Sequence, residues 1–531
     1  MSLFLSFLAF ALPGLPLAAG LVARSRDAAA AGRLTVRAAG FAAVLATLGV
    51  ASLFFWGPHT VRWAPFGVDA ALAFALRLDA VSVLMTVLIT FLGAVVLRFS
   101  QRYLAGDGGQ ARFFSWMSIT LGTVLLLVLA GQLLLLLLAW IATSLCLHRL
   151  LLHYPGRAGA IFSARKKFVV SRVGDACLLA AALLLHAHYR TFDYEGIFSA
   201  IAAGDSAGIG SAGLLLAMCA MLKSAQFPFH SWLPDTMETP TPVSAFMHAG
   251  IINGGGFLVV RLAPVFASAP LASHVLAVVG SVTAAFGALV MLAQPSVKRA
   301  LAYSTIAQMG FMILQCGLGA YGLALLHICA HSLYKAHAFL TSGSTIGAVP
   351  RAALPLRTTG LTWGVLAGGL IVALGATALH VLAPEHSAYP HVFVIVLALA
   401  VAYVIARACS AGGGAWVIAR GVAIAVMVTA LTFSVHAAAA VIFPGMPVAP
   451  QSLGVTLTVG VVFAGLFLFQ SLLWRTGHHP WGRRFYVHTL NGFYLGTFFN
   501  RLLGRLWPAH AILEPSPCPL PAYTPPLRQP V

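Results

Sequence analysis

The stretch "LLLAMCAMLKSAQFPFHSW", residues 214–232, closes an apolar run with a lysine and then places a proline five residues further on. Lys223 therefore lies at the edge of, or inside, a segment long enough to cross a membrane. Pro228 removes the hydrogen bond to the carbonyl group of Ser224, so we expect the helix to break there. Free carbonyl groups at membrane depth must be satisfied by side chains or water. The stretch thus predicts a small wet pocket beside a lysine that exchanges protons.

The composition of the whole chain is that of a membrane protein. The 531 residues are 60% hydrophobic and only 8% charged, with a mean hydropathy of +0.92. Apolar runs of roughly 20 residues recur along the whole length, and we predict an all-α polytopic fold with about 15 transmembrane helices. The first run lacks the basic segment of a signal peptide, so we interpret it as a transmembrane helix. The spans are expected near residues 3–23, 38–56, 80–98, 113–130, 132–152, 167–186, 208–233, 242–262, 271–293, 300–319, 321–345, 360–383, 391–409, 417–443 and 453–474.

Basic residues gather in alternate loops, after spans one, three, five, nine, eleven and fifteen, whereas the intervening loops are poor in lysine and arginine. The positive-inside rule then predicts that the N-terminus is outside and the C-terminus in the cytoplasm. Residues 57–79 are less apolar and predict an extracytoplasmic hairpin.

The net charge and the cysteines exclude several classes of function. Basic loops explain the formal charge of +19 better than nucleic-acid binding does. The 7 cysteines are scattered and no pair has metal-ligand spacing, so no metal site, disulfide framework or cofactor is indicated. Since no nucleophile triad or phosphate-binding loop is recognisable either, we do not expect the chain itself to be an enzyme.

Apolar residues at three- and four-residue spacing follow the last span, with arginines between them. They predict a cytoplasmic amphipathic helix within residues 475–512, which either anchors the chain at the membrane interface or docks a soluble partner. Residues 513–531 are proline-rich and are expected to be disordered. The candidate docking residues are Tyr486, Phe493, Tyr494, Phe498 and Arg501.

Ionisable residues inside apolar runs are costly and indicate functional sites. His327, His331 and Lys335 are four residues apart in span eleven, so they drift by only about 40° per step and form one stripe on the helix. Because imidazole both accepts and donates protons, this stripe predicts a proton wire.

Other polar residues in the spans are candidate members of the same path. Ser244 and His248 share a face of span eight, directly after the expected break. Lys298 opens span ten and is either a path residue or an ordinary cytoplasmic cation. The supporting residues are Ser144 and His148 of span five, and Arg172 and Asp175 of span six, which form a possible ion pair within one helix.

Three motifs carry a resemblance to a known family. "LKSAQFPFHSWLPDTMETPTPVSAFMHAG", "VKRALAYSTIAQMGFM" and "HICAHSLYKAHAFLTSGS" resemble the antiporter-like, proton-translocating subunits of respiratory complex I and of Mrp cation/proton antiporters. The resemblance implies that Lys223 is the lysine of the broken helix and His248 the histidine of the next one. It further implies that the stripe on span eleven is the central proton path, and that Asp175 is the aspartate that follows "RVG".

The chain departs from that family at several positions. Ile141 follows Trp140 where the family has a glutamate, so Lys223 lacks its usual carboxylate partner. The sequence has no lysine after Lys335, and we expect no long lateral helix after span fifteen. The organisation that we expect is N-terminal helices and hairpin (1–79), antiporter-like core (80–345), further transmembrane helices (346–474), cytoplasmic helix (475–512) and tail (513–531).

Motifs in both halves of the chain narrow the resemblance. "SLCLHRLLLHYPGR", "HAGIINGGGFLVVRLAP" and "YVHTLNGFYLGTFFNRLLGRLWP" are similar to the DabB family, the membrane subunits of an inorganic carbon pump. The resemblance implies a bacterial inner-membrane protein that pairs with DabA, a cytoplasmic zinc protein. In such a pair, cation flow through the membrane subunit drives the hydration of carbon dioxide to bicarbonate by DabA.

Two other functions stay open at this point. One is a proton-pumping subunit of an NADH–quinone oxidoreductase, an Mrp antiporter or a membrane hydrogenase, and the missing terminal lysine argues against it. The other is a non-conducting membrane anchor for a soluble enzyme, and the intact stripe on span eleven argues against that.

Overall fold

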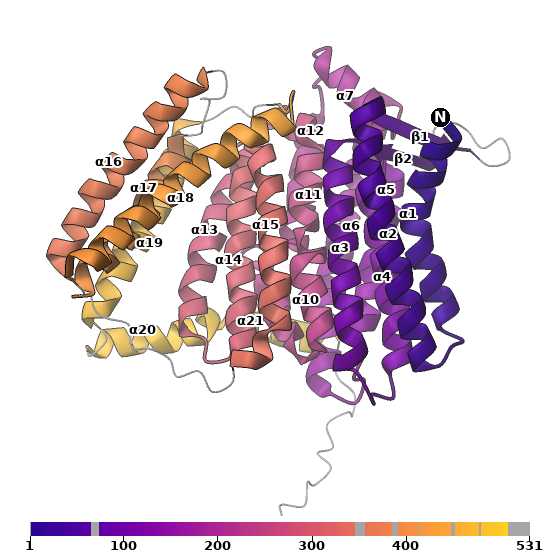
Figure 1. Ribbon diagram of the computed structural model, residues 1–531, viewed down its shortest axis with the longest axis horizontal. Coiled ribbons are helices and arrows are strands. Elements are labelled where there is room, and N and C mark those ends of the chain that lie inside the picture. Colours follow the sequence, from indigo (N-terminus) through magenta and orange to yellow (C-terminus); the bar gives the residue numbers. More distant parts are fainter. Residues whose placement is uncertain are drawn as a thin grey trace, which may run out of the picture.

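The long apolar stretches form helices that stand side by side and are joined by short connections at both ends (Figure 1). In this computed structural model the described residues are 2–64, 74–345, 356–384, 391–412, 414–447, 452–476 and 479–507. The predicted tail 513–531 and residues 508–512 before it lie outside them.

The N-terminal part of the bundle combines long helices with a two-stranded antiparallel sheet, in which His59 pairs with Leu78 and Trp63 with Phe74. The sheet lies where the sequence predicts a hairpin, at the same end of the bundle as the N-terminus (Figure 1). The elements are α1 (Ser2–Ala23), α2 (Ala28–Trp56), β1 (His59–Trp63), β2 (Phe74–Leu78), α3 (Ala80–Tyr103), α4 (Gln110–Leu129), α5 (Leu133–Leu151) and α6 (Ala158–Tyr189).

An ion network fixes this end of the bundle. Asp79 closes a capping box at the start of α3, because its Oδ1 accepts from the amide of Ser82 at 2.9 Å and the Ser82 hydroxyl accepts from the Asp79 amide at 2.9 Å. The same carboxylate lies 2.6 Å from Nη1 of Arg261 and 2.8 Å from Nε of Arg77. Arg77 also pairs with Glu195 at 3.2 Å. These arginines therefore join the hairpin to helices far apart in the sequence.

The central part contains the interrupted segments. The elements are α7 (Tyr194–Ala202), α8 (Ile209–Lys223), η3 (Phe229–Ser231), α9 (Trp232–Asp235), η4 (Thr236–Glu238), α10 (Thr241–Ala249), η5 (Ile251–Asn253), α11 (Gly254–Arg261), α12 (Ala263–Ala267), α13 (Pro270–Ala293), α14 (Val297–Gly317), α15 (Tyr321–Leu340) and η6 (Ser342–Thr345). One hydrophobic core runs from α1 to α15.

The C-terminal part packs on a smaller cluster of its own, formed by apolar residues of α16, α17 and α18. A further cluster joins α13 and α14 to the start of α17 and to α19. The elements are α16 (Thr358–Leu382), α17 (His391–Ser410), α18 (Gly414–Ile442), α19 (Leu453–Thr476), α20 (Pro480–Leu490), η8 (Gly492–Tyr494) and α21 (Leu495–Leu506).

Twelve helices in the described ranges are long and apolar enough to cross a membrane. Three further segments of the expected 15 are also helical, but α8 is shorter, and α14 and α15 are not among the twelve. The fold class is thus a polytopic helical membrane protein, while the count of 15 stays a prediction.

Glycines let α13 and α14 pack backbone against backbone. A Cβ atom added at Gly280 would lie 2.5 Å from the backbone nitrogen of Leu314, and one at Gly287 would lie 2.6 Å from that of Ala307. Small residues permit this close approach between membrane helices. The contact holds α14 in place, and α14 supplies several partners of the functional site.

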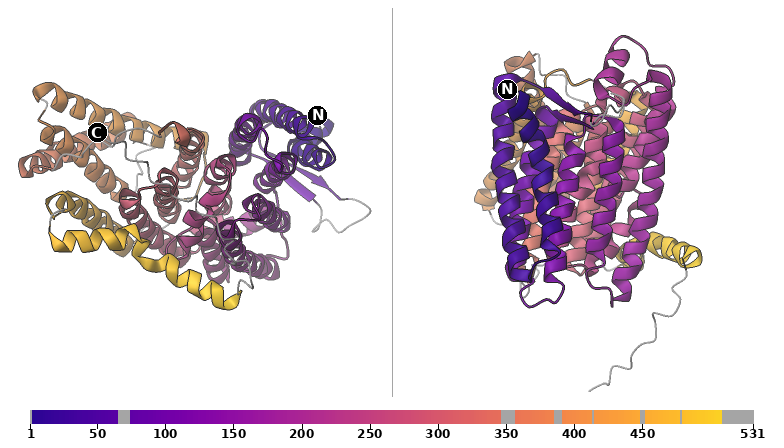
Figure 2. Two further views of the ribbon diagram at one scale, coloured as in Figure 1. Left: turned by 90° about the horizontal axis from the view of Figure 1, so that it is seen from below. Right: turned by 90° about the vertical axis from the view of Figure 1, so that its right-hand side faces the viewer.

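The chain after α19 does not form the single amphipathic helix that the sequence predicts. Gly492, Phe493 and Tyr494 have positive φ values of 57°, 51° and 62°, so α20 and α21 meet at a kink. A Cβ atom on Gly492 would lie 2.9 Å from the hydroxyl oxygen of Tyr303, which explains why a glycine stands at this close approach. The two helices lie across the ends of the bundle, opposite the hairpin (Figures 1 and 2).

Candidate functional site

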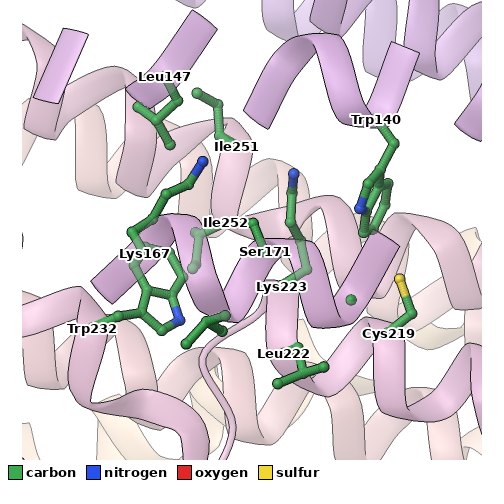
Figure 3. A pocket seen from close by; sticks show the side chains of 12 residues that line it. Trp140, Leu147, Lys167, Ser171, Cys219, Leu222, Lys223, Trp232, Ile251 and Ile252 are labelled. Atoms are coloured by element: carbon green, nitrogen blue, oxygen red, sulfur yellow. The ribbon is translucent and has the colours of Figure 1, made fainter. Parts of the chain in front are cut away.

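The end of α8 lines a small cavity among α5, α6, α8, α9 and η5. Its volume of about 20 Å³ is enough for roughly one water molecule. The Nζ atom of Lys223 lies 4.4 Å from the ring centroid of Trp140, within cation–π range. Lys167 reaches into the same cavity from α6 (Figure 3). We call this space the lysine cavity.

A second space of about 20 Å³ is also lined by Lys223. It is lined by residues of α3, α4, α5 and α11, among them Thr143 and Gly254. Lys223 therefore borders two water-sized spaces.

Lys167 is a member of the site that the sequence analysis missed. Its side chain is buried, and its Nζ donates to the carbonyl oxygen of Ser144 at 2.7 Å and to the hydroxyl oxygen at 2.8 Å. The expected span began at residue 167, which made this lysine look like a loop cation. Because α6 begins at Ala158 instead, Lys167 lies inside the helix.

The supporting residues of α5 and α6 gather around the lysine cavity. Arg172 lies 2.6 Å from the carboxylate of Asp175, and its Nη2 donates to the Ser144 hydroxyl at 3.3 Å. His148 is adjacent, with its ring 5.4 Å from that of Phe168. Four predicted residues thus meet in one place. No carboxylate is among the residues that line the cavity in the described structure.

The helix before the cavity ends earlier than the sequence predicts. The helical residues of α8 stop at Lys223, Ala225 has a φ of 50°, and Pro228 lies in the turn that precedes η3. The carbonyl oxygen of Ser224, expected to lose its helical partner, accepts from Nε2 of Gln226 at 2.8 Å. A side chain therefore satisfies it. Pro228 lies five residues beyond the last residue of α8. Its role in breaking the helix stays a prediction.

The stripe on α15 is polar and buried, with Lys335 and His331 almost fully enclosed. The rings of His327 and His331 are 6.2 Å apart. Nζ of Lys335 donates to the carbonyl oxygen of Leu301 on α14 at 3.1 Å. Both ring nitrogens of His331 are buried without a hydrogen-bond partner among the described residues. Both ring nitrogens can therefore form a hydrogen bond with a transient water molecule or take up a proton.

His327, at one end of the stripe, and His248, which stacks on Phe339 of α15, are both held by α14. Nδ1 of His327 lies 2.8 Å from the amide oxygen of Gln315, and Nε2 lies 3.1 Å from that of Gln308. Nδ1 of His248 is 3.0 Å from the Thr305 hydroxyl. All three partners belong to α14, so both histidines are held by neutral groups on one helix.

The short segment η5 lies between the lysine cavity and the stripe. Ile251 and Ile252 line the cavity, and the Ser224 hydroxyl donates to the carbonyl oxygen of Ile252 at 2.7 Å. The next residue, Asn253, is buried, and its amide donates to the Ser332 hydroxyl on α15 at 2.8 Å. Asn253 was not among the residues predicted from the sequence. The signal that could have found it is an amide placed before three glycines in an apolar run.

Two predicted path residues lie apart from these contacts. Ser244 is buried on α10 beside Thr239, with 3.3 Å between their hydroxyl oxygens. Lys298 lies half-buried in the first turn of α14. Their place in a path stays a prediction.

The predicted docking residues are exposed on the surface helices. Phe498 is 63% and Tyr486 52% exposed. Tyr494 and Arg501 are exposed as well, whereas the exposed ring of Phe493 also packs on Phe286 of α13. Another face of α21 contacts the bundle through Asn500, which accepts a hydrogen bond from Lys166 of α6.

Lys166 links α21 to the bundle. Its Nζ donates to Asp235 at 2.8 Å, to Asn500 of α21 at 2.7 Å and to the carbonyl oxygen of Ser231 at 3.2 Å. The next residue is Lys167. Of these two consecutive lysines of α6, Lys166 contacts α21 and Lys167 lines the lysine cavity.

Comparisons with known proteins agree with this architecture. The transmembrane domain model of NADH:quinone oxidoreductase and Mrp antiporters matches residues 130–409. The model of the N-terminus of complex I chain 5 matches residues 63–114.

Similar proteins cover most of the chain. The probable inorganic carbon transporter subunit DabB2 of Halothiobacillus neapolitanus is 37% identical over 522 residues, 94% of each chain. The probable subunit DabB of Hydrogenovibrio crunogenus is 39% identical over 335 residues, 62% of this chain and 63% of the relative. A chain of the Mrp complex from Dietzia sp. has a TM-score of 0.58 at 25% identity, which covers 95% of this chain and 57% of that one.

Proposed function

The chain belongs to the DabB family of inorganic carbon transporter subunits, within the wider NADH:quinone oxidoreductase/Mrp antiporter family, and from this premise we propose that it conducts protons for an inorganic carbon uptake complex. Cation flow through the chain drives the hydration of carbon dioxide to bicarbonate on a cytoplasmic partner. The ion is a proton, since the buried ionisable groups of the site are mainly lysines and histidines.

The observation that supports this proposal most is the succession of polar groups through the interior. It begins at the lysine cavity with Lys223, continues through Asn253 of η5, and reaches His331 and Lys335 on α15. The stripe also contains His327, and both His327 and the neighbouring His248 contact polar side chains of α14. A chain that served only as an anchor would have no use for these costly buried groups.

We assign the surface helices α20 and α21 to partner docking. Their exposed aromatic residues lie at the end of the bundle opposite the hairpin and the N-terminus (Figure 1). In the proposed orientation this end faces the cytoplasm of a bacterial inner membrane. The partner is a DabA-like zinc protein, and the zinc chemistry belongs to it.

A gentle detergent pull-down of the tagged chain, with mass spectrometry and zinc analysis, tests the assembly. We expect a large zinc-bearing soluble protein at near-equal amount. Phe498→Asp should release this protein, because it places a charge in the apolar row of α21. Trp63→Asp supplies a matched control, since Trp63 is an exposed aromatic residue of the hairpin, outside the spans and at the other end of the bundle.

A growth assay tests the function. The chain and its partner, expressed in a bacterium that lacks carbonic anhydrases, should restore growth in ordinary air. Restoration by the partner alone would contradict the proposal.

The likeness to the Mrp complex favours a second candidate, a proton-pumping subunit of an Mrp antiporter, an NADH–quinone oxidoreductase or a membrane hydrogenase. Co-purification of flavin or iron–sulfur subunits in place of a zinc protein would establish this candidate.

A further inference from the structure

The lysine cavity contains more positive charge than the proposed path explains. Lys223 and Lys167 both line it, and Arg172 lies on the adjoining turn of α6. The nearby carboxylate is Asp175, and it lies 2.6 Å from Arg172. Asp175 also interacts electrostatically with both lysines. Three cations therefore share one carboxylate, and the buried Lys167 and the partly buried Lys223 face one water-sized space.

Other titratable groups around Lys167 do not balance this charge. Cys146 and His148 come from α5, and Cys219 comes from α8. The remaining cavity lining from α9 and η5 is apolar or aromatic, with Trp232, Ile251 and Ile252. Two like charges in such a site disfavour each other, and an unpaired buried charge is costly.

We propose that Lys167 and Lys223 form one proton-exchanging pair, which holds a single excess proton and passes it from one amine to the other through the water in the lysine cavity. The proposal rests on the proposed function and adds Lys167 to its path. The transfer is balanced: the ammonium of Lys223 gives a proton to the water, and the water gives one to the neutral amine of Lys167. The reverse step restores the starting state.

The bonding of Lys167 suits both protonation states. Its two hydrogen bonds go to the carbonyl and hydroxyl oxygens of Ser144. A neutral amine has two N–H donors, so it keeps both bonds and still has a lone pair for the cavity water. The ammonium form keeps the same bonds and donates its third proton instead. The side chain therefore need not move when the proton transfers.

Lys223 is held in a similarly permissive way. The face of Trp140 favours the ammonium form by a cation–π contact and makes no hydrogen bond that fixes the proton. Gly254 leaves the Lys223 side chain its space, since an added Cβ atom would lie 3.3 Å from Cε. No carboxylate lines the cavity among the described residues, and the second ionisable amine there is that of Lys167.

The decisive variant is Lys167→Gln in the complete complex. The glutamine amide has two N–H donors for Ser144 but holds no proton at neutral pH. We expect proton flux into proteoliposomes, read with an internal pH dye, to fall to the level of vesicles without the complex. Flux equal to that of the unaltered complex would overturn the proposal. Arg149→Met removes a cation from α5 that faces Trp116 and should leave the flux unchanged.

A second measurement separates the pair from the proposed function. The chain has only five lysines, at positions 166, 167, 223, 298 and 335. With 13C-labelled lysine side chains, NMR titration of the complex should show that the signals of Lys167 and Lys223 titrate together and share one proton near neutral pH. In Lys167→Gln the Lys223 signal should titrate in a single step at higher pH. Two lysines that stay fully protonated and titrate independently would contradict the pair, whatever the flux assay shows.

An anion bound between the two lysines is the competing arrangement. Replacement of chloride by gluconate, and addition of bicarbonate, should leave both NMR titrations where they are. A shift of both lysine signals with the anion, lost in Lys167→Gln, would overturn the shared proton and establish an anion site.

Discussion

Two groups of buried or partly buried cations in this protein have opposite kinds of partner. At the hairpin end, Arg261 and Arg77 share the carboxylate of Asp79 at 2.6 and 2.8 Å. In the lysine cavity, Lys167 bonds to the neutral oxygens of Ser144 and Lys223 lies over the ring of Trp140. Arginine stays charged in proteins, and there it is matched with an acid. Lysine can lose its proton, and in the lysine cavity no carboxylate lines the space beside it. The first group holds the fold together, and the second is free to change its charge.

The largest loss of proton flux is expected from Lys223→Gln. The substitution removes a group that holds a proton and keeps a polar side chain at the cavity. Proton flux and growth in ordinary air should fall to the level without the chain, while the melting temperature of the purified complex stays the same. A variant that still conducts, or one that fails to fold, would erase the proposed difference between the two groups.

Asp79→Asn is expected to lower the stability and to leave the proton flux unchanged. It leaves Arg261, which is only 4% exposed, without its acid. Breaking a buried pair in this way typically costs about 3–5 kcal/mol of stability. The yield and the melting temperature should fall, but the flux for each folded molecule should not. A matched control is Asp193→Asn, whose partner Arg62 is 46% exposed.

Acid should act on the same carboxylate. Burial alone would raise the pKa of Asp79, but the Arg261 charge and hydrogen bond, the Ser82 amide and Arg77 outweigh it and hold the pKa below its usual range. The stabilisation is then fully present above the ordinary aspartate pKa of about 3.9 and is lost as the pH falls below it toward the folded value. Unfolding measured from pH 6 to 3 should show this loss in the unaltered chain, and Asp79→Asn should remove it. If both chains lose the same stability in acid, the loss arises from groups other than Asp79.

A partial effect is expected between the lysine cavity and the stripe. Asn253→Ala removes the hydrogen bond to Ser332 that ties η5 to α15. A neutral hydrogen bond contributes about 1 kcal/mol to stability, so the chain should fold. The flux should fall without vanishing, because the proton-holding groups remain. Unchanged flux would remove Asn253 from the path.

The smallest effect is expected at the rim of the arginine group. Glu195 is 51% exposed and pairs with Arg77 and Arg62 at 3.2 Å. Exposed pairs of this kind contribute roughly 0–1 kcal/mol, and salt screens them. Glu195→Gln should therefore change the melting temperature little. A loss as large as that of Asp79→Asn would show that both acids act as one unit.

The sequence is informative where a charged residue interrupts an apolar run. Lys223, His331 and Lys335 are visible for that reason, and the structure places them inside the bundle. Most helix positions follow from the same runs to within a few residues, but α8 ends at Lys223, ten residues before the expected end, and α2 begins at Ala28, ten residues before the expected start. The start of α6 at Ala158, nine residues early, moves Lys167 from a loop into the site.

What the sequence hides depends on contacts between distant segments. Asn253 becomes important through Ser332, which is 79 residues away. The kink between α20 and α21 depends on Gly492 packing against Tyr303. Neither partner can be recognised from local periodicity, since each is an ordinary residue until the helices meet.

The contact between Lys166 and Asn500 has a consequence for biosynthesis. The two residues are 334 positions apart, so α6 enters the membrane long before Asn500 has been translated. During that interval Asp235 is the side chain available to the Lys166 ammonium, and the contact with α21 closes only when nearly all of the described chain has emerged. The contact between α6 and α21 therefore forms only after the helices between them have been synthesised. Fragments that end before α21 leave this lysine incompletely satisfied, and they are poor substitutes for the whole chain in assembly experiments.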